Sequence, residues 1–273
     1  MLDDTVKTHG ITEISIANNW VDRAVEEITI NGYTLVDSGL DSLQLEYLRK
    51  RIDQIYDYQV QQLGSQDALH AIKDANIARA LCAYDRAFIE VALLPQIQNV
   101  CSAILGKQFI LMSQNGIINP AKEQHYQFSW HRDLNYQHYV SSKPLAISAL
   151  VCVDPFNDYT GGTHVLPATH RVEAFPSREF VIANQKLIEA PAGTIILFDC
   201  MVFHRTGLNK SVDPRRAINH IITSPMIRQQ YDLENLVDMT GLTDQQRTFF
   251  GEGFGMPASP YQWRVNKLNK VKQ

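Results

Sequence analysis

The sequence has few cysteines, and no two of them form a recognisable motif. The 273 residues include four, at Cys82, Cys101, Cys152 and Cys200, with no CxxC pair. This wide spacing argues against a structural zinc site, a redox pair or a disulfide framework. We expect four free thiols in a reducing compartment, which favours the cytoplasm.

Long apolar runs and a secretion signal are also missing. No apolar stretch reaches the length of about 18 residues that a membrane-spanning helix needs. The first residues, Met1-Leu2-Asp3-Asp4, show no basic segment followed by an apolar one, so no signal peptide is visible. The expected protein is cytoplasmic and has no membrane partner.

An excess of positive charge is absent as well. The chain has 25 Lys and Arg against 29 Asp and Glu, for a formal net charge of −4, which gives no electrostatic reason to expect a nucleic-acid partner. With 45% hydrophobic residues and only 14 Gly and 11 Pro, the composition excludes a disordered or collagen-like chain.

No internal repeat and no Pro/Gly/Ser linker divides the chain, so we expect one domain over residues 1–273. Its three parts are a helical front with leading strands (1–107), a β-rich body (108–225) and C-terminal helices that form a lid (226–273). In the body, short apolar runs between clusters of Gly, Pro, Asn and Asp are typical of a β-sandwich or barrel. The predicted strands are 108–112, 146–153, 194–198 and 216–223.

The front shows helical periodicity after an extended or mixed segment at 11–30 and a short strand at 32–36. Asp41-Ser42 is a helix start, and the apolar residues that follow recur every three or four positions, which defines one helix face. The residues of this apolar face are Leu45, Leu48, Ile52, Ile55 and Tyr56. Two further helices are predicted at 67–79 and 88–105, the latter interrupted near Pro95.

The most informative of the nine histidines belong to a candidate metal site. His131 and Asp133 form a His-x-Asp pair, and residues i and i+2 of a strand point to the same face. His204, just after the strand ending at Phe198, is the best candidate for a third ligand. Two histidines and one carboxylate form the facial triad of non-haem Fe(II) oxygenases. About 0.6 His-x-Asp pairs are expected by chance, so the pair alone is weak.

Arg215 strengthens this interpretation, because it follows His204 by 11 residues and directly precedes a predicted strand. An arginine projecting into a barrel can bind a carboxylate through its planar two-pronged head.

Several blocks together resemble the phytanoyl-CoA dioxygenase family of Fe(II)/2-oxoglutarate oxygenases. Their order and spacing fit that family from about residue 108 to 225, whereas the front and the tail carry no comparable motif. The blocks are WHRDLNY (130–136), GGTHVLPATH (161–170), AGT (192–194) with Phe198-Asp199, HRTGLNKS (204–211) and RRA (215–217).

The resemblance implies a fold and a set of roles. The fold is a double-stranded β-helix, a jelly-roll core like that of cupins, mainly β with flanking helices. His131, Asp133 and His204 would ligate Fe(II), and Arg215 would pair with the distal carboxylate of 2-oxoglutarate; Arg216 is the alternative in register. Further candidates around the cosubstrate are Asn119 first, then Gln114 and Asn115, and also Thr206 and Ser211. For Ser211, turn-capping is the favoured role.

Substrate contacts are less well defined by the sequence. His164 and His170 are expected to be structural, since the third ligand is already supplied. The candidates are Gln127, Trp130, Asn135 and Arg228, with Tyr231, Trp263 and Arg264 as possible lid residues.

The implied function is a dioxygenase that uses Fe(II), 2-oxoglutarate and O2, and hydroxylates an unactivated C–H bond with release of succinate and CO2. Related halogenases carry a small residue in place of the carboxylate, so Asp133 favours hydroxylation or another oxidation over halogenation. The expected partner is a small free metabolite or biosynthetic intermediate, because no basic cluster near the motifs offers a grip for a CoA phosphate. Two alternatives are a non-oxygenase jelly-roll metal protein, such as a cupin-like isomerase, and a non-catalytic binding protein.

Overall fold

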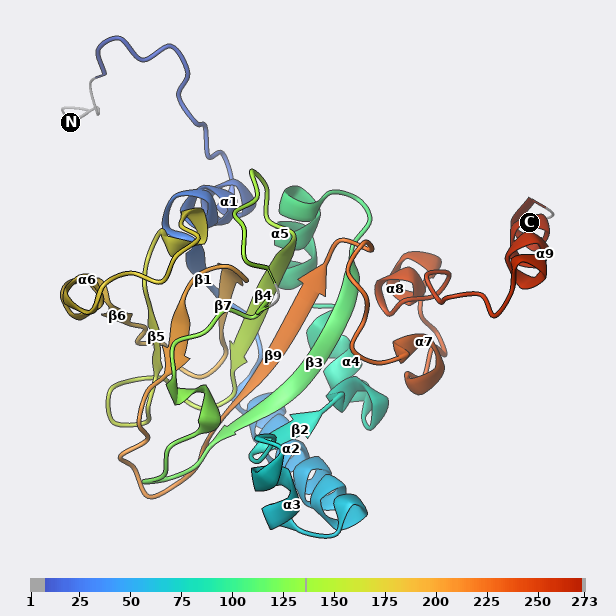
Figure 1. The fold of residues 1–273 in the computed structure, drawn as a ribbon, viewed down its shortest axis with the longest axis horizontal. Coiled ribbons are helices and arrows are strands. Elements are labelled where there is room, and N and C mark those ends of the chain that lie inside the picture. Colours follow the sequence, from blue (N-terminus) through green and yellow to red (C-terminus); the bar gives the residue numbers. More distant parts are fainter. Residues whose placement is uncertain (1–7, 136, 272–273) are drawn as a thin grey trace.

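Two antiparallel sheets lie at the centre of the computed structural model, which describes residues 8–135 and 137–271 (Figure 1). The larger sheet has the strand order β1-β7-β4-β9-β3-β2, and the smaller has the order β6-β5-β8. Together they form an open sandwich and not a closed barrel. The strands are β1 (Tyr33–Asp37), β2 (Ile77–Arg79), β3 (Ile110–Asn119), β4 (Ala146–Cys152), β5 (Thr163–Val165), β6 (Lys186–Leu187), β7 (Thr194–Asp199), β8 (His204–Thr206) and β9 (Arg215–Thr223).

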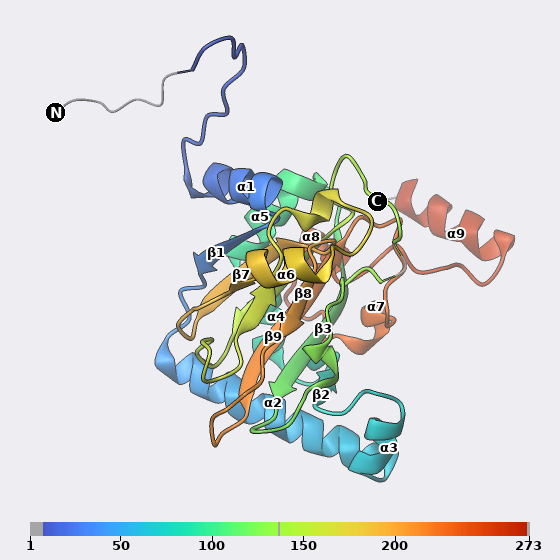
Figure 2. The ribbon, with the colours of Figure 1, turned by 60° about the vertical axis from the view of Figure 1, so that its left-hand side comes forward.

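Helices from the front of the chain pack on the outer face of the larger sheet (Figure 2). Among the described residues the helices are α1 (Trp20–Asn31), α2 (Ser42–Leu63), α3 (Gln66–Ala71), α4 (Arg86–Ala92), α5 (Pro95–Leu105), α6 (Arg178–Asn184), α7 (Leu233–Leu236), α8 (Asp244–Phe249) and α9 (Pro260–Val271), with 3-10 turns at Leu81–Ala83 (η1), Tyr126–Phe128 (η2) and Thr169–Arg171 (η3).

Strand β7 shows how the sandwich is built. Ile195 and Leu197 belong to the core between the larger sheet and the helices, whereas Ile196 and Phe198 belong to the core between the two sheets. Successive side chains of a strand point to opposite faces, so a strand covered on both sides is apolar at every position. The space between the sheets is where the candidate site lies.

Helix α2 forms as its sequence predicts. Asp41 is the N-cap residue and accepts a hydrogen bond from the Gln44 backbone N–H, while the Gln44 side chain accepts one from the Asp41 N–H, which completes a capping box. All five predicted apolar residues of this helix are buried. The predicted strands of the body are also present, and β3 extends to Asn119.

The segment 11–30, expected to be extended or mixed, is mixed, because α1 begins at Trp20 with Asn19 as its N-cap. One prediction for the front was wrong. The segment 67–79 is not one helix: α3 ends at Ala71, and residues Ile77–Arg79 form β2, an edge strand paired with β3. The helix 88–105 is divided at Pro95 as expected, into α4 and α5.

Within the described residues, no single helix has the length and apolar character needed to cross a membrane; α4 and α5 pass that test only as a pair bent by 46°. The predicted absence of a signal peptide concerns residues 1–4, which lie outside the described range.

Candidate metal centre

Backbone hydrogen bonds bring the His-x-Asp segment against β8. The His131 N–H donates to the His204 carbonyl at 3.0 Å, and the His204 N–H donates to the His131 carbonyl at 3.1 Å. The Asp133 N–H donates to the carbonyl of Cys200 at 3.1 Å. His131 therefore forms an isolated antiparallel bridge and not part of a longer strand, and this bridge places three ligand-type side chains together.

The three side chains can reach one ion. One ligand atom from each of His131, Asp133 and His204 lies within 4.8 Å of the other two. His204 Nε2 is 3.5 Å from Asp133 Oδ1, and the two imidazole ring centroids are 4.3 Å apart. The separation of 3.5 Å is near the ~3 Å expected between adjacent ligands that each lie about 2.1 Å from a metal.

The ring nitrogens are arranged for metal binding. His131 Nδ1 lies 2.9 Å from the Ser129 carbonyl, and His204 Nδ1 lies 3.0 Å from the Val202 carbonyl. A carbonyl only accepts, so each Nδ1 carries the proton and each Nε2 presents its lone pair. Asp133 Oδ2 is buried and has no hydrogen-bond partner. An imidazole–imidazole–carboxylate set with an unsatisfied oxygen fits a divalent iron with open positions.

Electrostatics favour the ligand form of His131 and Asp133, whereas the pKa of His204 is raised, because the lowering effect of burial is outweighed by the nearby Asp133. Burial, and then the neighbouring His204, lower the pKa of His131 to about 4, so its imidazole is neutral near pH 7. Burial alone would raise the pKa of Asp133, but the neighbouring His204 and His131 lower it overall. A neutral imidazole and an ionised carboxylate are the forms that bind metals.

Arg215 lies in the same cavity, between the two sheets. Its side chain is buried, the Nη2–H donates to the Gly161 carbonyl at 2.8 Å, and its guanidinium carbon is 4.0 Å from the Phe156 ring centroid. Burial lowers the pKa of Arg215 to about 10, so the side chain remains charged near neutral pH. Its Nε–H has no partner, and no carboxylate of the described residues forms an ion pair with it. A buried cation without a counter-charge is a site for an anionic ligand.

The cavity has a volume of about 30 Å³ and is lined from both sheets. Its lining residues are Ile117, Gln127, His131, Asp133, Leu150, Thr163, Phe198, His204, Thr206, Arg215 and Asn219.

A protein-family comparison decides which of the expected classes applies. The family model for phytanoyl-CoA dioxygenase (PhyH) matches residues 29–217, which is more than half of the chain. The chain belongs to the phytanoyl-CoA dioxygenase family. It is therefore a 2-oxoglutarate-dependent non-haem iron dioxygenase whose metal and cosubstrates are Fe(II), 2-oxoglutarate and O2. Family membership favours this class over the cupin-like isomerase and the non-catalytic binding protein.

Individual proteins agree with the family. An uncharacterised protein of Mycobacterium tuberculosis is 26% identical and aligns with 86% of this chain and 88% of its own length. The ectoine dioxygenase of Halomonas elongata is 28% identical over a shorter stretch, 32% of this chain and 35% of that protein.

Solved structures confirm the fold. EctD from S. alaskensis, crystallised with 2-oxoglutarate and 5-hydroxyectoine, has a TM-score of 0.62 and 18% identity, with 84% of this chain and 83% of that chain covered. The non-haem monooxygenase ThoJ has a TM-score of 0.59 and 17% identity, with coverage of 77% and 80%. The predicted jelly-roll core with flanking helices is thus confirmed, as two sheets that do not close.

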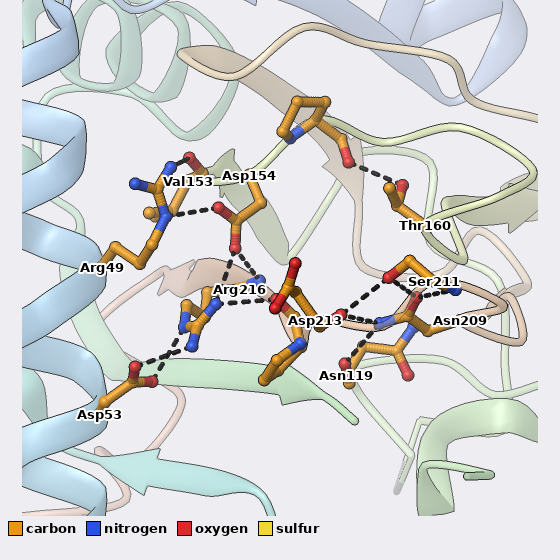
Figure 3. A network of polar contacts seen from close by, with 12 residues as sticks. Arg49, Asp53, Asn119, Val153, Asp154, Thr160, Asn209, Ser211, Asp213 and Arg216 are labelled. Carbon is orange, nitrogen blue, oxygen red and sulfur yellow. Dashed lines mark hydrogen bonds and ion pairs between the residues drawn. The ribbon is translucent and has the colours of Figure 1, made fainter. Parts of the chain in front are cut away.

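The two arginines that the register left open lie on opposite faces of β9. Arg216 points out of the cavity toward α2, where it forms ion pairs with Asp53 at 2.8 Å and with Asp154 at 3.4 Å (Figure 3). Asp154 also pairs with Arg49 of α2 at 2.6 Å. Arg216 therefore joins the sheet to the helix layer, and Arg215 is the arginine that the cavity contains.

The two amides expected near the cosubstrate do not line the cavity. Asn119 is fully buried, and its Nδ2 donates to the carbonyls of Gly161 at 3.3 Å and Gly207 at 3.0 Å, so it holds two loops together. Gln114 lies on the helix side of β3, where its Nε2 donates to the Phe88 carbonyl at 2.7 Å. The alternation of β3 places Ile117 in the cavity and leaves Gln114 on the opposite face.

The remaining candidates divide between the cavity and other places. Thr206 and Gln127 line the cavity. Trp130 faces a separate groove, and Asn135 and Arg228 are exposed and line neither space.

Other side chains that the sequence flagged serve the scaffold or lie elsewhere. Ser211 Oγ donates to Asn209 Oδ1 at 2.6 Å, which is a turn-capping contact, and Asn209 Nδ2 donates to the Asn119 carbonyl at 3.0 Å (Figure 3). Trp263 and Arg264 are exposed on α9, which projects away from the sheets in Figure 1.

Asn219 is an amide residue of the cavity that was not predicted from the sequence. It follows Arg215 by four positions on β9, so the two side chains share a face. The Ser148 hydroxyl donates to Asn219 Oδ1 at 2.7 Å, and Asn219 lines the cavity. The alternation of β9 counted from Arg215 is the pattern that identifies it.

Proposed function

We propose that this dioxygenase hydroxylates an unactivated C–H bond of a small-molecule metabolite or biosynthetic intermediate, coupled to conversion of 2-oxoglutarate to succinate and CO2. The observation that carries the proposal is the complete His131–Asp133–His204 set beside a buried arginine without a counter-charge. Retention of the Asp133 carboxylate supports hydroxylation over halogenation. The similarity to an ectoine dioxygenase supports a small polar substrate class.

Each cavity residue has a proposed task. His131, Asp133 and His204 hold Fe(II) through two Nε2 atoms and a carboxylate oxygen. Arg215 binds the distal carboxylate of 2-oxoglutarate, and Thr206 lies beside it in the same cavity. When bound, iron and 2-oxoglutarate supply the oxidising chemistry, and the protein supplies the orientation of the ligands and a water-poor pocket.

Apolar residues exclude water from this site. Ile117, Leu150 and Phe198 line the cavity together with the polar groups. A low-dielectric wall strengthens the ion pair between Arg215 and an incoming carboxylate. We also propose a cytoplasmic location, because all four cysteines are free and buried, which fits a reducing compartment where ferrous iron persists.

The proposed ligand set is tested without knowing the substrate. Anaerobic addition of Fe(II) and 2-oxoglutarate should give the visible charge-transfer band of a chelated keto acid, and His204→Ala should abolish it. Asp133→Ala should abolish succinate formation. His164→Ala is the matched control, because His164 lies on β5 and does not line the cavity. A well-folded wild-type protein without the band, or an Asp133→Ala variant with full activity, would contradict the assignment.

The hydroxylation itself is tested with a substrate panel. Candidate metabolites are scored by succinate release above the uncoupled background, and hits are analysed by mass spectrometry. A product heavier by one oxygen atom supports hydroxylation, whereas loss of two hydrogens would replace it with desaturation.

A further inference from the structure

An open groove of about 900 Å³ lies on the outer face of the smaller sheet, behind the metal centre. Arg205 lines the groove, while its neighbours His204 and Thr206 line the metal cavity. Likewise Trp130 lines the groove, and the next residue, His131, lines the cavity. Alternating side chains of one strand face opposite sides, so the backbone of these two segments separates the groove from the cavity.

The walls of the groove are aromatic and aliphatic. Phe128 and Trp130 come from the segment before His131, and Phe175, Val181 and Ile182 come from α6 and the loop before it. The Trp130 and Phe175 ring centroids are 6.2 Å apart, and the two rings are tilted by 46° relative to each other. Phe175 is 48% exposed and Ile182 is 62% exposed, so this apolar surface is not covered by the described part of the chain.

Two arginines give the groove a positive charge. The guanidinium carbon of Arg205 is 5.1 Å from the Phe128 ring centroid and 5.3 Å from that of Trp130, which fixes its position by cation–π contacts. Its hydrogen bonds are long: 3.3 Å to Gln185 Oε1 and 3.4 Å to the Thr206 carbonyl. Arg178, at the start of α6, also lines the groove. Among the residues that the structure describes, neither arginine forms an ion pair with a carboxylate.

We propose that this groove is a second ligand site, which binds a small organic anion with a carboxylate attached to a flat apolar body. The guanidinium groups of Arg205 and Arg178 would bind the carboxylate, and the rings of Phe128, Trp130 and Phe175 would contact the apolar part. The volume lies in the range of small-molecule sites, roughly 300–1,000 Å³. A carboxylate on an apolar body satisfies both features of the groove, whereas a purely apolar ligand would leave the guanidinium groups unmatched.

The site is independent of the 2-oxoglutarate site. A β-strand lies between the two, so both can be filled together, and the proposal does not depend on the oxidation chemistry. A ligand in the groove would contact the side chains adjacent to His131 and His204 without touching the metal.

The proposal is tested by calorimetric titration of the full-length protein with 2-naphthoate and with 2-naphthamide, which has the same shape and no charge. We expect 2-naphthoate to bind at least tenfold more tightly than the amide. Arg205→Gln should weaken 2-naphthoate at least tenfold, and Arg178→Gln, a change at an exposed position, should weaken it about threefold or more. Arg264→Gln is the matched control, because it removes the same charge on α9, at the opposite end of the molecule from α6 (Figure 1).

Three results would overturn the proposal. One is the absence of 2-naphthoate binding, and another is equal affinity for the acid and the amide. The third is displacement of 2-naphthoate by saturating 2-oxoglutarate with Mn(II), which would place the compound in the metal cavity. Thermal unfolding of each variant verifies its fold, and Arg178→Gln keeps the test decisive if Arg205→Gln unfolds.

Discussion

Arg215 and Arg216 are adjacent residues with opposite surroundings. The Arg215 side chain is buried between the sheets with no carboxylate partner in the described chain, whereas Arg216 is neutralised by Asp53 and Asp154 on the helix side. The alternation of β9 alone produces this difference. One arginine is therefore available to a ligand, and the other contributes to the scaffold.

This difference predicts that an Arg→Gln substitution has different effects at the two positions. Arg215→Gln should raise the dissociation constant for 2-oxoglutarate by about 10- to 100-fold, because a hydrogen bond to a charged group contributes about 1.5–3 kcal/mol. Titration of the anaerobic Fe(II) complex by absorbance measures this. Arg216→Gln should lower the melting temperature and leave the dissociation constant within about threefold. Equal effects of the two variants on 2-oxoglutarate affinity would refute the assignment.

Individual residues were predictable where a motif fixed them and not where the register of a strand was needed. The clustering of His131, Asp133 and His204, with Arg215 in the same cavity, agrees with the motif blocks from which these candidates were predicted. Gln114 was misplaced because β3 carries amide side chains on both faces, Gln114 on one and Asn115 and Asn119 on the other, so its sequence does not reveal which side faces the cavity. Only the pairing with β9, in which Asn119 is opposite Arg215 and Asn115 is opposite Asn219, determines which β3 side chains lie on the cavity side.

Asn219 yields a second prediction at this scale. Because Ser148 orients its amide, Asn219 offers an N–H donor to a ligand in the cavity. Asn219→Ala should reduce kcat/KM for succinate formation about 2- to 10-fold, the range of one neutral hydrogen bond. Ser148→Ala should reduce kcat/KM by a smaller factor, because it removes the hydrogen bond that orients the Asn219 amide but leaves the amide in place. Wild-type kinetics in Asn219→Ala would rule out this contact.

At the scale of elements, the segment after α3 shows why local periodicity failed. Lys73 and Asn76 have φ values of 58° and 65°, and this left-handed backbone ends the helix. The next residues pair with β3, about 40 positions later in the chain. Such distant pairing is invisible to a local pattern, whereas α2 was predictable because both its cap and its apolar face are local.

The loop before β5 gives a prediction for an element. Gly161 has a φ of 73°, and a Cβ there would lie 2.5 Å from Asn119 Nδ2 and 2.6 Å from the Gly207 carbonyl oxygen. Gly161→Ala should therefore displace the loop whose carbonyl holds Arg215. The expected loss is about 1–3 kcal/mol of stability together with weaker 2-oxoglutarate binding.

Gly241 provides a matched control for this substitution. It has the same φ of 73°, but a Cβ there would meet no atom within 4 Å. Gly241→Ala should cost only the backbone strain, about 1 kcal/mol, and leave 2-oxoglutarate affinity unchanged. If calorimetry shows the same loss of 2-oxoglutarate affinity in both variants, the close approach of the loops at Gly161 and Gly207 does not explain that loss.

At the scale of the whole molecule, the front of the chain completes the catalytic body. Strands β1 and β2 form the two edges of the larger sheet, although they lie before residue 108. The core between this sheet and the helices includes Ala24 at one end of the chain and Phe250 at the other. We infer one folding unit, in which helices α2 to α5, which the family model also covers, support the sheet that carries Arg215.

Metal binding should therefore stabilise the entire fold. The buried Asp133 Oδ2 has no hydrogen-bond partner, which destabilises the folded state, and a bound ion would satisfy it. Mn(II) at 100 times its dissociation constant should add about 2.7 kcal/mol, or roughly 5–10 °C in melting temperature. Scanning calorimetry should show this shift in wild type and in His164→Ala, and no shift in His204→Ala. An equal shift in His204→Ala would mean that the ion binds elsewhere.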